Sequence, residues 1–275
     1  MGNKDYQSQI VMADLSQFSK LYLVALADFH EGARDADHVI SDGYIQWIAE
    51  REDARTILNG DMMNCAWKDS TPELWEDLIT PDDAYARLRA RLMPIKDKIL
   101  MITRGGHCES IFRKVGVDFM ARLAYDLGDI PYRPDGGMIA IRLSKNGHTQ
   151  VFTGWATHGW GGARTIGAKI KKVEDLANIA NVDVIVLSHD HTQAIHRLNV
   201  LDPPGSKIQF KNTMYWGIQR KILINTGGFI KYAGYIQNKG YSPQDLGTPR
   251  IRIELKSDKV GGRWSEYHLD LHASI

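Results

Sequence analysis

Two apolar runs of the sequence are each followed by a pair of residues that can bind a metal ion. Asp28 and His30 follow the first run, and His189 and His191 follow a much later one. In an extended chain, residues i and i+2 point to the same side, so each pair can be directed at one point. The spacing therefore indicates two half-sites, one near each end of the chain.

Two further candidates complete the set. Asp61 closes the stretch Asn59-Gly60-Asp61 after a third apolar run, and His158 follows a fourth. Carboxylate and imidazole together suit zinc, manganese or iron, and not the all-oxygen shell that calcium prefers. The candidates are too many for one tetrahedral ion, but they fit two ions that share a carboxylate.

The elements that must position these residues alternate along the first half of the chain. The expected strands are the short apolar runs Leu21–Ala27, Thr56–Leu58, Ile99–Thr103, Met138–Leu143, Val151–Thr153, Val182–Leu187 and Lys221–Asn225. The expected helices are Asp37–Arg51, Thr71–Leu78 (with Thr71 as N-cap and Pro72 at its first position), Asp82–Leu92, Val117–Leu127 and Gly167–Asn178. This order predicts layered α/β architecture with a late antiparallel portion, in which ligands bind at the carboxyl ends of strands. We expect a single domain over residues 1–275, with residues 1–19 as an extension and a core of about 20–275.

The composition is that of an ordinary globular chain with balanced charge. Lys and Arg number 34 against 33 Asp and Glu, giving a net charge of +1. This balance slightly disfavours long duplex DNA as a partner, although a local basic groove could exist. We expect Lys169–Lys172 to be a solvated helix face.

Only two cysteines, Cys65 and Cys108, occur in the sequence, and so few cysteines lead us to expect a reducing compartment. The sequence predicts no signal peptide or membrane span, so we expect the cytoplasm, or the host cytoplasm if the chain is phage-encoded.

The ordered set of candidates resembles the calcineurin-like metallophosphoesterases, in the versions found in bacteria and phages. The family pattern is D-x-H, G-D, G-N-H-[DE], a lone His, and G-H-x-H. Here the corresponding series runs Asp28-Phe29-His30, Gly60-Asp61, Gly105-Gly106-His107, His158, and Ser188-His189-Asp190-His191. The likeness spans about residues 21 to 230.

The resemblance implies a fold, a site and an activity. The fold is a four-layer α/β/β/α sandwich of two mixed sheets flanked by helices. The implied ligands are Asp28, His30 and His191 for one metal, His158 and His189 for the other, and Asp61 as the bridge. His107 is the implied catalytic histidine. The implied reaction is hydrolysis of a phosphomonoester or phosphodiester through a hydroxide bridging two divalent ions, with Mn²⁺ expected and Fe, Zn or Ni as alternatives. The substrate is a small molecule or nucleotide, and nucleic acid also fits.

The third motif departs from the family, and two alignments are open. Without a gap, Gly106 replaces the Asn whose carbonyl is a metal ligand, His107 is retained, and Cys108 replaces the acid. With one inserted residue, His107 becomes the ligand and Cys108 takes the place of the histidine. We prefer the gapless version because it keeps the strand length and the histidine. Under it the second metal lacks one ligand, which water or the Cys108 thiolate could replace.

Other chemistries are weaker fits. A cysteine-dependent phosphatase loop needs H-C-x5-R, but Arg113 follows Cys108 one residue too soon, and the glycines that wrap a phosphate are missing. The alternative of another class is a catalytically impaired relative that serves as a metal-stabilised binding or scaffold module. Within the enzyme class, a nuclease or cyclic-nucleotide phosphodiesterase competes with a phosphatase.

Four more residues are candidates near the site. Arg104 and Arg164 could contact phosphate. Trp160 could stack on an aromatic group of the substrate, although packing is the commoner role. Asn64 could support a ligand from behind or bind the metal itself.

Overall fold

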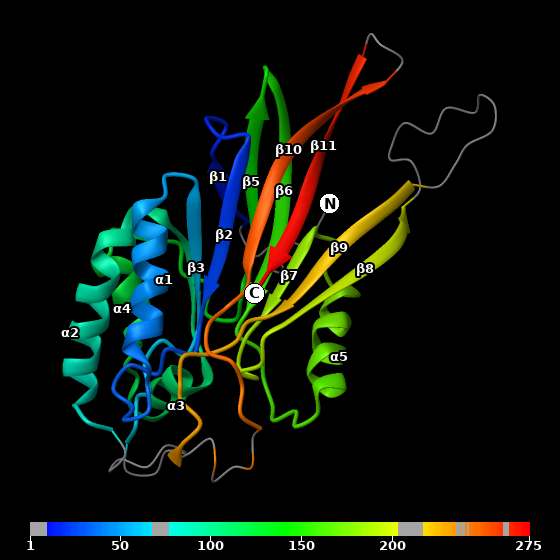
Figure 1. The fold of residues 1–275 in the computed structure, drawn as a ribbon. Coiled ribbons are helices and arrows are strands. Elements are labelled where there is room, and N and C mark those ends of the chain that lie inside the picture. The colour runs from blue at the N-terminus through cyan, green and yellow to red at the C-terminus, as the bar shows by residue number, and fades with distance from the viewer. Residues whose placement is uncertain are drawn as a thin grey trace, which may run out of the picture.

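The computed structural model describes residues 10–67, 77–202, 217–234, 237, 240, 242–260 and 264–275. These residues form two mixed β-sheets packed face to face, with helices on both outer sides (Figure 1). The first sheet has the order β1-β5-β6-β7-β9-β8, with the bounds β1 Val11–Asp14, β5 Gly137–Lys145, β6 His148–Thr157, β7 Val184–Leu187, β8 Ala194–Asp202 and β9 Gly217–Asn225. Its β6, β7 and β9 are parallel, whereas the pairs β5·β6 and β8·β9 are antiparallel.

The second sheet has the order β11-β10-β2-β3-β4. Its strands are β2 Lys20–Leu26, β3 Ala54–Asn59, β4 Ile99–Thr103, β10 Arg250–Val260 and β11 Trp264–Ser274. Strands β2, β3 and β4 run parallel, so their carboxyl ends lie at one edge. Strand β10 is antiparallel to both of its neighbours.

The helices divide between the two outer faces. The second sheet is covered by α1 His38–Glu50, α2 Pro81–Leu92, the 3₁₀ helix η3 Met93–Lys98, α3 Gly106–Val115 and α4 Phe119–Asp126, and the first sheet by α5 Ile166–Ala177. Between the sheets, Leu23 and Ile57 of the second sheet pack with Ile141 and Val186 of the first. All four are buried. The expectation of a four-layer α/β/β/α sandwich is confirmed.

The expected strands are all present, as are four of the expected helices, with ends shifted by a few residues. The helix expected to open at Thr71 lies largely outside the described residues. Within the expected N-terminal extension, Val11–Asp14 pairs in parallel with β5 as an edge strand. Helix α3 is not among the expected helices.

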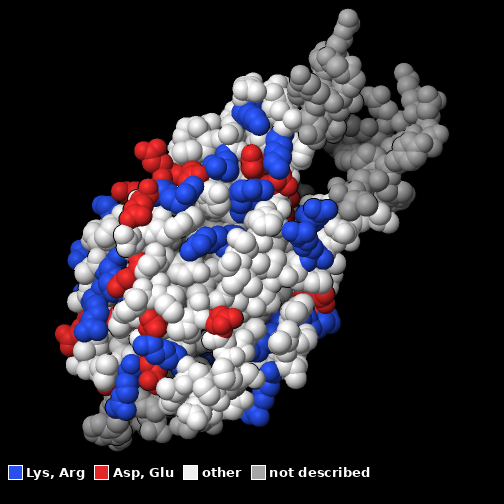
Figure 2. All heavy atoms as spheres, viewed as in Figure 1, with Lys and Arg blue, Asp and Glu red and all other residues white. Residues whose placement is uncertain are grey.

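The surface carries both signs of charge. On the face in Figure 2, Lys and Arg side chains are interspersed with Asp and Glu. Among the helices that the structure describes, none is long and apolar enough to cross a membrane.

Candidate metal centre

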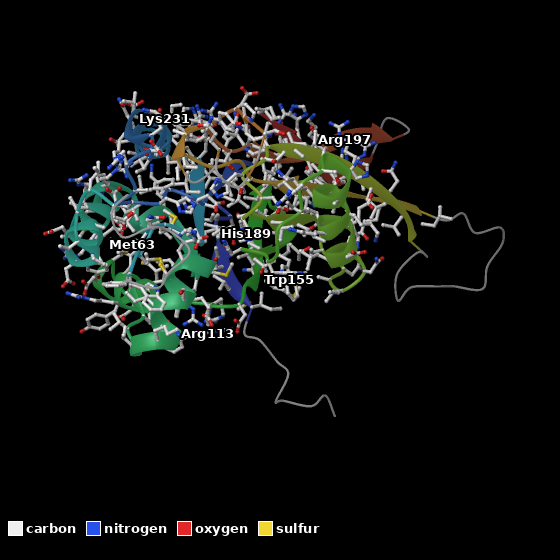
Figure 3. The ribbon with its side chains drawn as sticks, turned by 90° about the horizontal axis from the view of Figure 1, so that it is seen from below. Met63, Arg113, Trp155, His189, Arg197 and Lys231 are labelled. Carbon is white, nitrogen blue, oxygen red and sulfur yellow. The ribbon has the colours of Figure 1, made fainter. Side chains whose placement is uncertain are left out.

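The six expected ligands all follow strand ends, and the fold brings them together. Asp28 and His30 follow β2, Asp61 follows β3, His158 follows β6, and His189 and His191 follow β7. Together with His107, their ligand atoms form the groups Asp28–His30–His191, His30–Asp61–His107 and Asp61–His158–His189, in each of which the atoms lie within 4.8 Å of one another. Figure 3 shows His189 near the middle of the molecule, between Met63 and Trp155.

The backbone at these positions is not extended, which corrects the strand-alternation argument of the sequence. Five of the six residues have positive φ: Asp28 54°, His30 48°, Asp61 45°, His189 75° and His191 49°. Residues other than glycine rarely adopt this left-handed backbone conformation unless the surrounding structure imposes it. The ligand pairs therefore converge because the chain turns sharply after each strand, and not because of alternation along a strand.

The first group has its nitrogen and oxygen atoms directed at one another. His191 Nε2 lies 3.3 Å from Asp28 Oδ1 and 3.2 Å from His30 Nε2. Asp28 is fully buried, and its Oδ1 has no hydrogen-bond partner. A buried carboxylate oxygen without a partner costs free energy unless a cation compensates it. These residues therefore fit a divalent metal ion.

The second group is centred on Asp61. His158 Nε2 lies 2.9 Å from Asp61 Oδ2, and His189 Nδ1 lies 3.3 Å from His158 Nε2. His158 Nδ1 donates to the carbonyl oxygen of Asn59 at 2.9 Å. This bond on the far side of the ring orients Nε2 towards the cluster, as in many metal-ligating histidines.

The electrostatics of the cluster suit metal ligation. Burial acts to raise the pKa of Asp61, but His158 and His107 outweigh it and hold that pKa well below its usual value. Burial, followed by the neighbouring His107 and His191, lowers the pKa of His30 to about 3. For His158, burial is outweighed by Asp61 and Asp28, which raise the pKa to about 9. In the metal-free chain Asp61 and His158 are thus an ion pair, while His30 is neutral.

Two glycines allow the backbone to approach the ligands closely. A Cβ at Gly105 would lie 2.1 Å from Asp61 Oδ1, and one at Gly60 would lie 2.5 Å from His158 Nδ1. Neither contact is sterically permitted. Gly60 and Gly105 must therefore be glycine, because any side chain at either position would clash with His158 or Asp61.

His107 lies in the first turn of α3, at the rim of the cluster. Its backbone N–H donates to Asp61 Oδ1 at 2.9 Å, and its Nδ1 donates to the carbonyl oxygen of Asn64 at 2.8 Å. Its ring packs edge-to-face on His30, with the centroids 4.6 Å apart. With Nδ1 engaged, Nε2 is the atom available to the cleft above the cluster, whose lining includes His107.

The residues beside His107 differ sharply in burial. Gly106 is exposed, and a Cβ there would meet nothing within 4 Å. Cys108 is fully buried in the core, with its Sγ 3.3 Å from Cys65 Sγ. The hydrogen bond to Cys65 and then burial raise the pKa of the Cys108 thiol well above its usual value. The structure therefore does not bring Cys108 to the ligand groups, in contrast to the expectation that its thiolate could replace a ligand.

Asn64 supports the cluster from behind. Its Oδ1 lies 3.3 Å from His30 Nδ1, and its Nδ2 donates to Asp77 Oδ1. Asn64 thus contacts two histidines of the cluster, His30 through its side chain and His107 through its carbonyl oxygen.

The expected substrate contacts are not brought to the cleft. Arg104 forms ion pairs with Asp118, at 2.8 Å, and with Glu109. Arg164 is exposed on the loop before α5, and Trp160 is 55% exposed. None of the three is among the lining residues of the cleft.

Two of the three lysines of α5 differ from expectation, whereas the side chain of Lys171 is exposed, as a solvated helix face predicts. Lys169 is buried and donates to the carbonyl oxygen of Asp190, and Lys172 pairs with the Asp190 carboxylate at 2.8 Å. This face of α5 therefore packs on the loop that carries His189 and His191, and is not a solvated surface.

A network of buried polar side chains lies beneath the cluster, and the sequence analysis does not predict it. Asn59 Nδ2 donates to the Thr157 carbonyl oxygen at 2.8 Å and to Ser188 Oγ at 2.7 Å, and its Oδ1 accepts from Thr103 Oγ1 at 3.3 Å. Thr226 Oγ1 donates to Ser188 Oγ. The only sequence signal is that each polar residue ends an apolar run, and Ser188, where the family has Gly, is accommodated by these bonds.

No family model matches the chain, and no curated protein matches it. The chain is similar in structure to a predicted phosphoesterase from Streptococcus pneumoniae, with 14% identity, a TM-score of 0.39, and coverage of 92% of this chain and 90% of that one. It is also similar to Vps29 of Chaetomium thermophilum, with 12% identity, a TM-score of 0.35, and coverage of 92% and 96%. GAP50, the anchor in the inner membrane complex of Plasmodium, gives 9% identity, a TM-score of 0.48, and coverage of 90% and 88%. At such low scores, none of these likenesses bears on the function of this chain.

Proposed function

We propose that the chain is a metal-dependent phosphoesterase of the calcineurin-like class, hydrolysing a phosphomonoester or phosphodiester. The observation that carries this proposal is the convergence of two aspartates and five histidines into overlapping ligand groups, six of them from four strand ends and His107 from α3. Asp61 belongs to two of these groups, which fits a carboxylate that bridges two ions.

The residues that would hold the metals are taken from the resemblance, and in the ligand groups Asp61 lies with His158 and His189 and, separately, with His30 and His107. Asp28, His30 and His191 would bind one ion, His158 and His189 the other, and Asp61 both. Bound divalent ions, with Mn²⁺ as our first choice, would supply Lewis-acid stabilisation of phosphoryl oxygens and a water of lowered pKa.

His107 would act as the general acid. Its Nδ1 proton is held by the carbonyl oxygen of Asn64, so a proton on Nε2 faces the cleft and can be donated to the leaving oxygen. The gapless alignment is supported by the clash that any side chain at Gly105 would cause with Asp61, and by the burial of Cys108.

We further propose that the chain works in a reducing compartment such as the cytoplasm, since Cys65 and Cys108 are free thiols.

The test is hydrolysis of p-nitrophenyl phosphate and of its bis-ester with Mn²⁺ added. We expect turnover of at least one ester, and a strong preference for either would distinguish monoesterase from diesterase activity. Asp61→Ala should abolish both turnover and tight metal binding. His107→Ala should reduce turnover by roughly 10²–10⁴-fold, the usual contribution of a general acid, while metal binding persists.

The scaffold alternative is favoured by one observation, the absence of any side chain at Gly106 where the family places a ligand. It predicts one tightly bound metal per chain and no turnover of either ester. Two bound metals with turnover would support the enzyme. Full activity of Asp61→Ala would contradict the proposed site.

A further inference from the structure

The cleft above the cluster has a second wall that the proposed chemistry does not use. This wall is formed by Ile230, Tyr232, Ser242, Gln244 and Leu246, from the segment between β9 and β10. Ile230 and Leu246 are partly exposed, and Tyr232 is 45% exposed. One aromatic ring, two apolar side chains and two neutral polar side chains therefore line the same cleft as His189 and Asp190.

The wall is fixed to the molecule at its base. The N–H of Gly247 donates to the carbonyl oxygen of Gly228 at 3.0 Å, which joins the two ends of the segment. The Tyr44 hydroxyl accepts from the Thr248 N–H at 3.2 Å and donates to the Thr248 carbonyl oxygen at 3.0 Å. A Cβ at Gly228 would lie 3.0 Å from His191 Nδ1. The wall thus begins directly against a proposed metal ligand.

Few charges face this cleft. Among the described lining residues outside the histidines, the charged ones are Asp61, Asp190 and Lys169. Asp190 pairs with Lys172, and Lys169 donates to the Asp190 carbonyl oxygen and to Thr192 Oγ1. Polyphosphates and nucleic acids are bound through arginine and lysine side chains directed at each phosphate. The described part of the cleft is therefore suited to one phosphoryl group, at the cluster, and not to several.

We propose that this wall binds an aromatic ring attached to a single phosphoryl group, as in an aryl phosphate or a nucleoside monophosphate. This inference rests on the proposed function, because the cluster is taken to hold the phosphoryl group. Tyr232 offers a ring on which a flat group can stack, and Ile230 and Leu246 offer apolar contact. Gln244 and Ser242 can donate to and accept from polar atoms on the edge of the ring.

The first test compares an aryl ester with a small alkyl ester of the same charge. With Tyr232→Ala, we expect kcat/KM for p-nitrophenyl phosphate to fall about tenfold, equivalent to about 1.4 kcal/mol, mainly through KM, because the stacking contact with the aryl ring is lost. The value for glycerol phosphate should change by less than about twofold. Tyr125→Ala is the matched control, since this tyrosine is 72% exposed on α4. Equal losses for both esters, or no loss for either, would overturn the proposal.

The second test measures binding and does not depend on turnover. We expect the metal-loaded chain to bind phenylphosphonate about tenfold more tightly than methylphosphonate, and Tyr232→Ala to remove the difference. Equal affinities in the unmutated chain would overturn the subsite. A phenyl preference without turnover of any ester would support the subsite while contradicting the proposed function.

The same assay separates the two sources of the ring and checks the charge argument. Tighter binding of adenosine monophosphate than of phenyl phosphate would identify the ring as a nucleobase, and the reverse order would identify it as a simple aryl group. Adenosine diphosphate should bind no more tightly than the monophosphate. Markedly tighter binding of the diphosphate would contradict a cleft built for one phosphoryl group.

Discussion

Three of the six expected ligand residues are held by an atom other than the one directed into the cluster. His158 Nδ1 donates to the carbonyl oxygen of Asn59, and His30 Nδ1 lies against Asn64 Oδ1. Asp28 Oδ2 accepts from the backbone N–H of His189 at 3.1 Å. These contacts leave the Nε2 atoms and Asp28 Oδ1 directed into the cluster. Orientation of this kind raises metal affinity, because less freedom is lost when the ion binds.

The contact between Asn64 and His30 can be tested directly. Asn64→Ala should weaken Mn²⁺ binding by roughly 10–100-fold, the usual effect of losing a group that orients a ligand. The backbone carbonyl that holds His107 is retained in this variant. Isothermal titration calorimetry measures the change, with Asn199→Ala, an exposed asparagine on β8, as the control. An unchanged affinity would mean that Asn64 does not orient His30.

The missing ligand at Gly106 gives a gain-of-function prediction. Because a Cβ at Gly106 meets nothing within 4 Å, Gly106→Asn should fold and place an amide beside the cluster. We expect the weaker of two Mn²⁺ sites to tighten roughly tenfold, equivalent to about 1.4 kcal/mol. Gly116→Asn is the control, since Gly116 ends the same helix, is equally open, and has a φ of 74° that Asn tolerates.

If both variants left the two metal affinities unchanged, Gly106 would not occupy the position of a ligand. The alignment with one inserted residue would then gain support. Metal content per chain, measured after dialysis, gives an independent count of the sites.

Protonation of His158 makes metal binding depend on pH. Burial opposes the charged ring, but Asp61 and Asp28 outweigh it and raise the pKa to about 9, so at pH 7 the metal-free ring is protonated. A metal ion at Nε2 must displace that proton. Binding at pH 7 should therefore release about one proton, and affinity should fall about tenfold for each pH unit below 9. His30, whose pKa is about 3, should release none.

Calorimetric titration in two buffers with different ionisation enthalpies counts the released protons. His158→Asn should remove the release while leaving His30 and His191 in place. Metal uptake without proton release by the unmutated chain would show that His158 is not a ligand.

At the scale of elements, the site depends on how the chain leaves each strand. The loop after β2 carries Asp28, His30 and then Glu31, a fully buried carboxylate. Arg91 of α2 donates to Glu31 and also contacts Asp42 at 2.8 Å. This ion pair anchors the loop that carries Asp28 and His30 to the helical layer, and without Arg91 the buried Glu31 carboxylate keeps only the more distant Arg87 and His38 as neighbours.

Arg91→Met should lower the free energy of unfolding by roughly 3 kcal/mol, because Glu31 would be buried without its closest partner. The matched control is Arg87→Met. Arg87 lies 3.6 Å from Glu31, but its side chain is 49% exposed, so the loss should stay below about 1 kcal/mol. Urea unfolding of the metal-free chain measures both. Equal effects would indicate that Arg91 does not compensate Glu31.

The elements themselves could largely be predicted from the sequence. Runs of Val, Ile and Leu located the parallel strands of both sheets, because such strands are buried on both faces. The strand β1 was missed, since it is a short edge strand with Met12 81% exposed. Helix α3 was missed because Gly105 and Gly106 indicate a loop, although Gly105 is glycine for its contact with Asp61.

The candidate site was predictable in its members but not in its geometry. The order of aspartates and histidines indicated which residues converge, whereas their left-handed backbone has no signature in periodicity. Lys169 contacts Thr192 across a separation of 23 residues, and the ion pairs of Arg104 with Glu109 and Asp118 follow from the path of the chain through α3, which was not predicted. The cleft-lining role of Tyr232 and its neighbours could not be predicted from the sequence, since no local pattern of residues distinguishes a binding wall from any other loop.

At the scale of the whole molecule, the cluster lies where the two sheets meet. Asp28, His30 and Asp61 come from loops of the second sheet, while His158, His189 and His191 come from loops of the first. Asn59 links the same sheets beneath the cluster through Ser188 Oγ. A bound ion would therefore join the two halves of the sandwich, and its binding free energy would add to the stability of the whole fold.

Metal loading should accordingly raise the melting temperature of the chain. A ligand that binds only the folded state at 100 times its dissociation constant stabilises it by about 2.7 kcal/mol, which is roughly 5–10 °C for a chain of this size. Differential scanning fluorimetry with added Mn²⁺ measures the shift, and EDTA should reverse it. Asp61→Asn should lose most of the shift because Asp61 contacts both groups. His196→Ala, a half-exposed histidine on β8, should retain it. A shift that survived Asp61→Asn but vanished in His196→Ala would place the stabilising ion elsewhere. The residues of the cluster would then be held together by their hydrogen bonds alone.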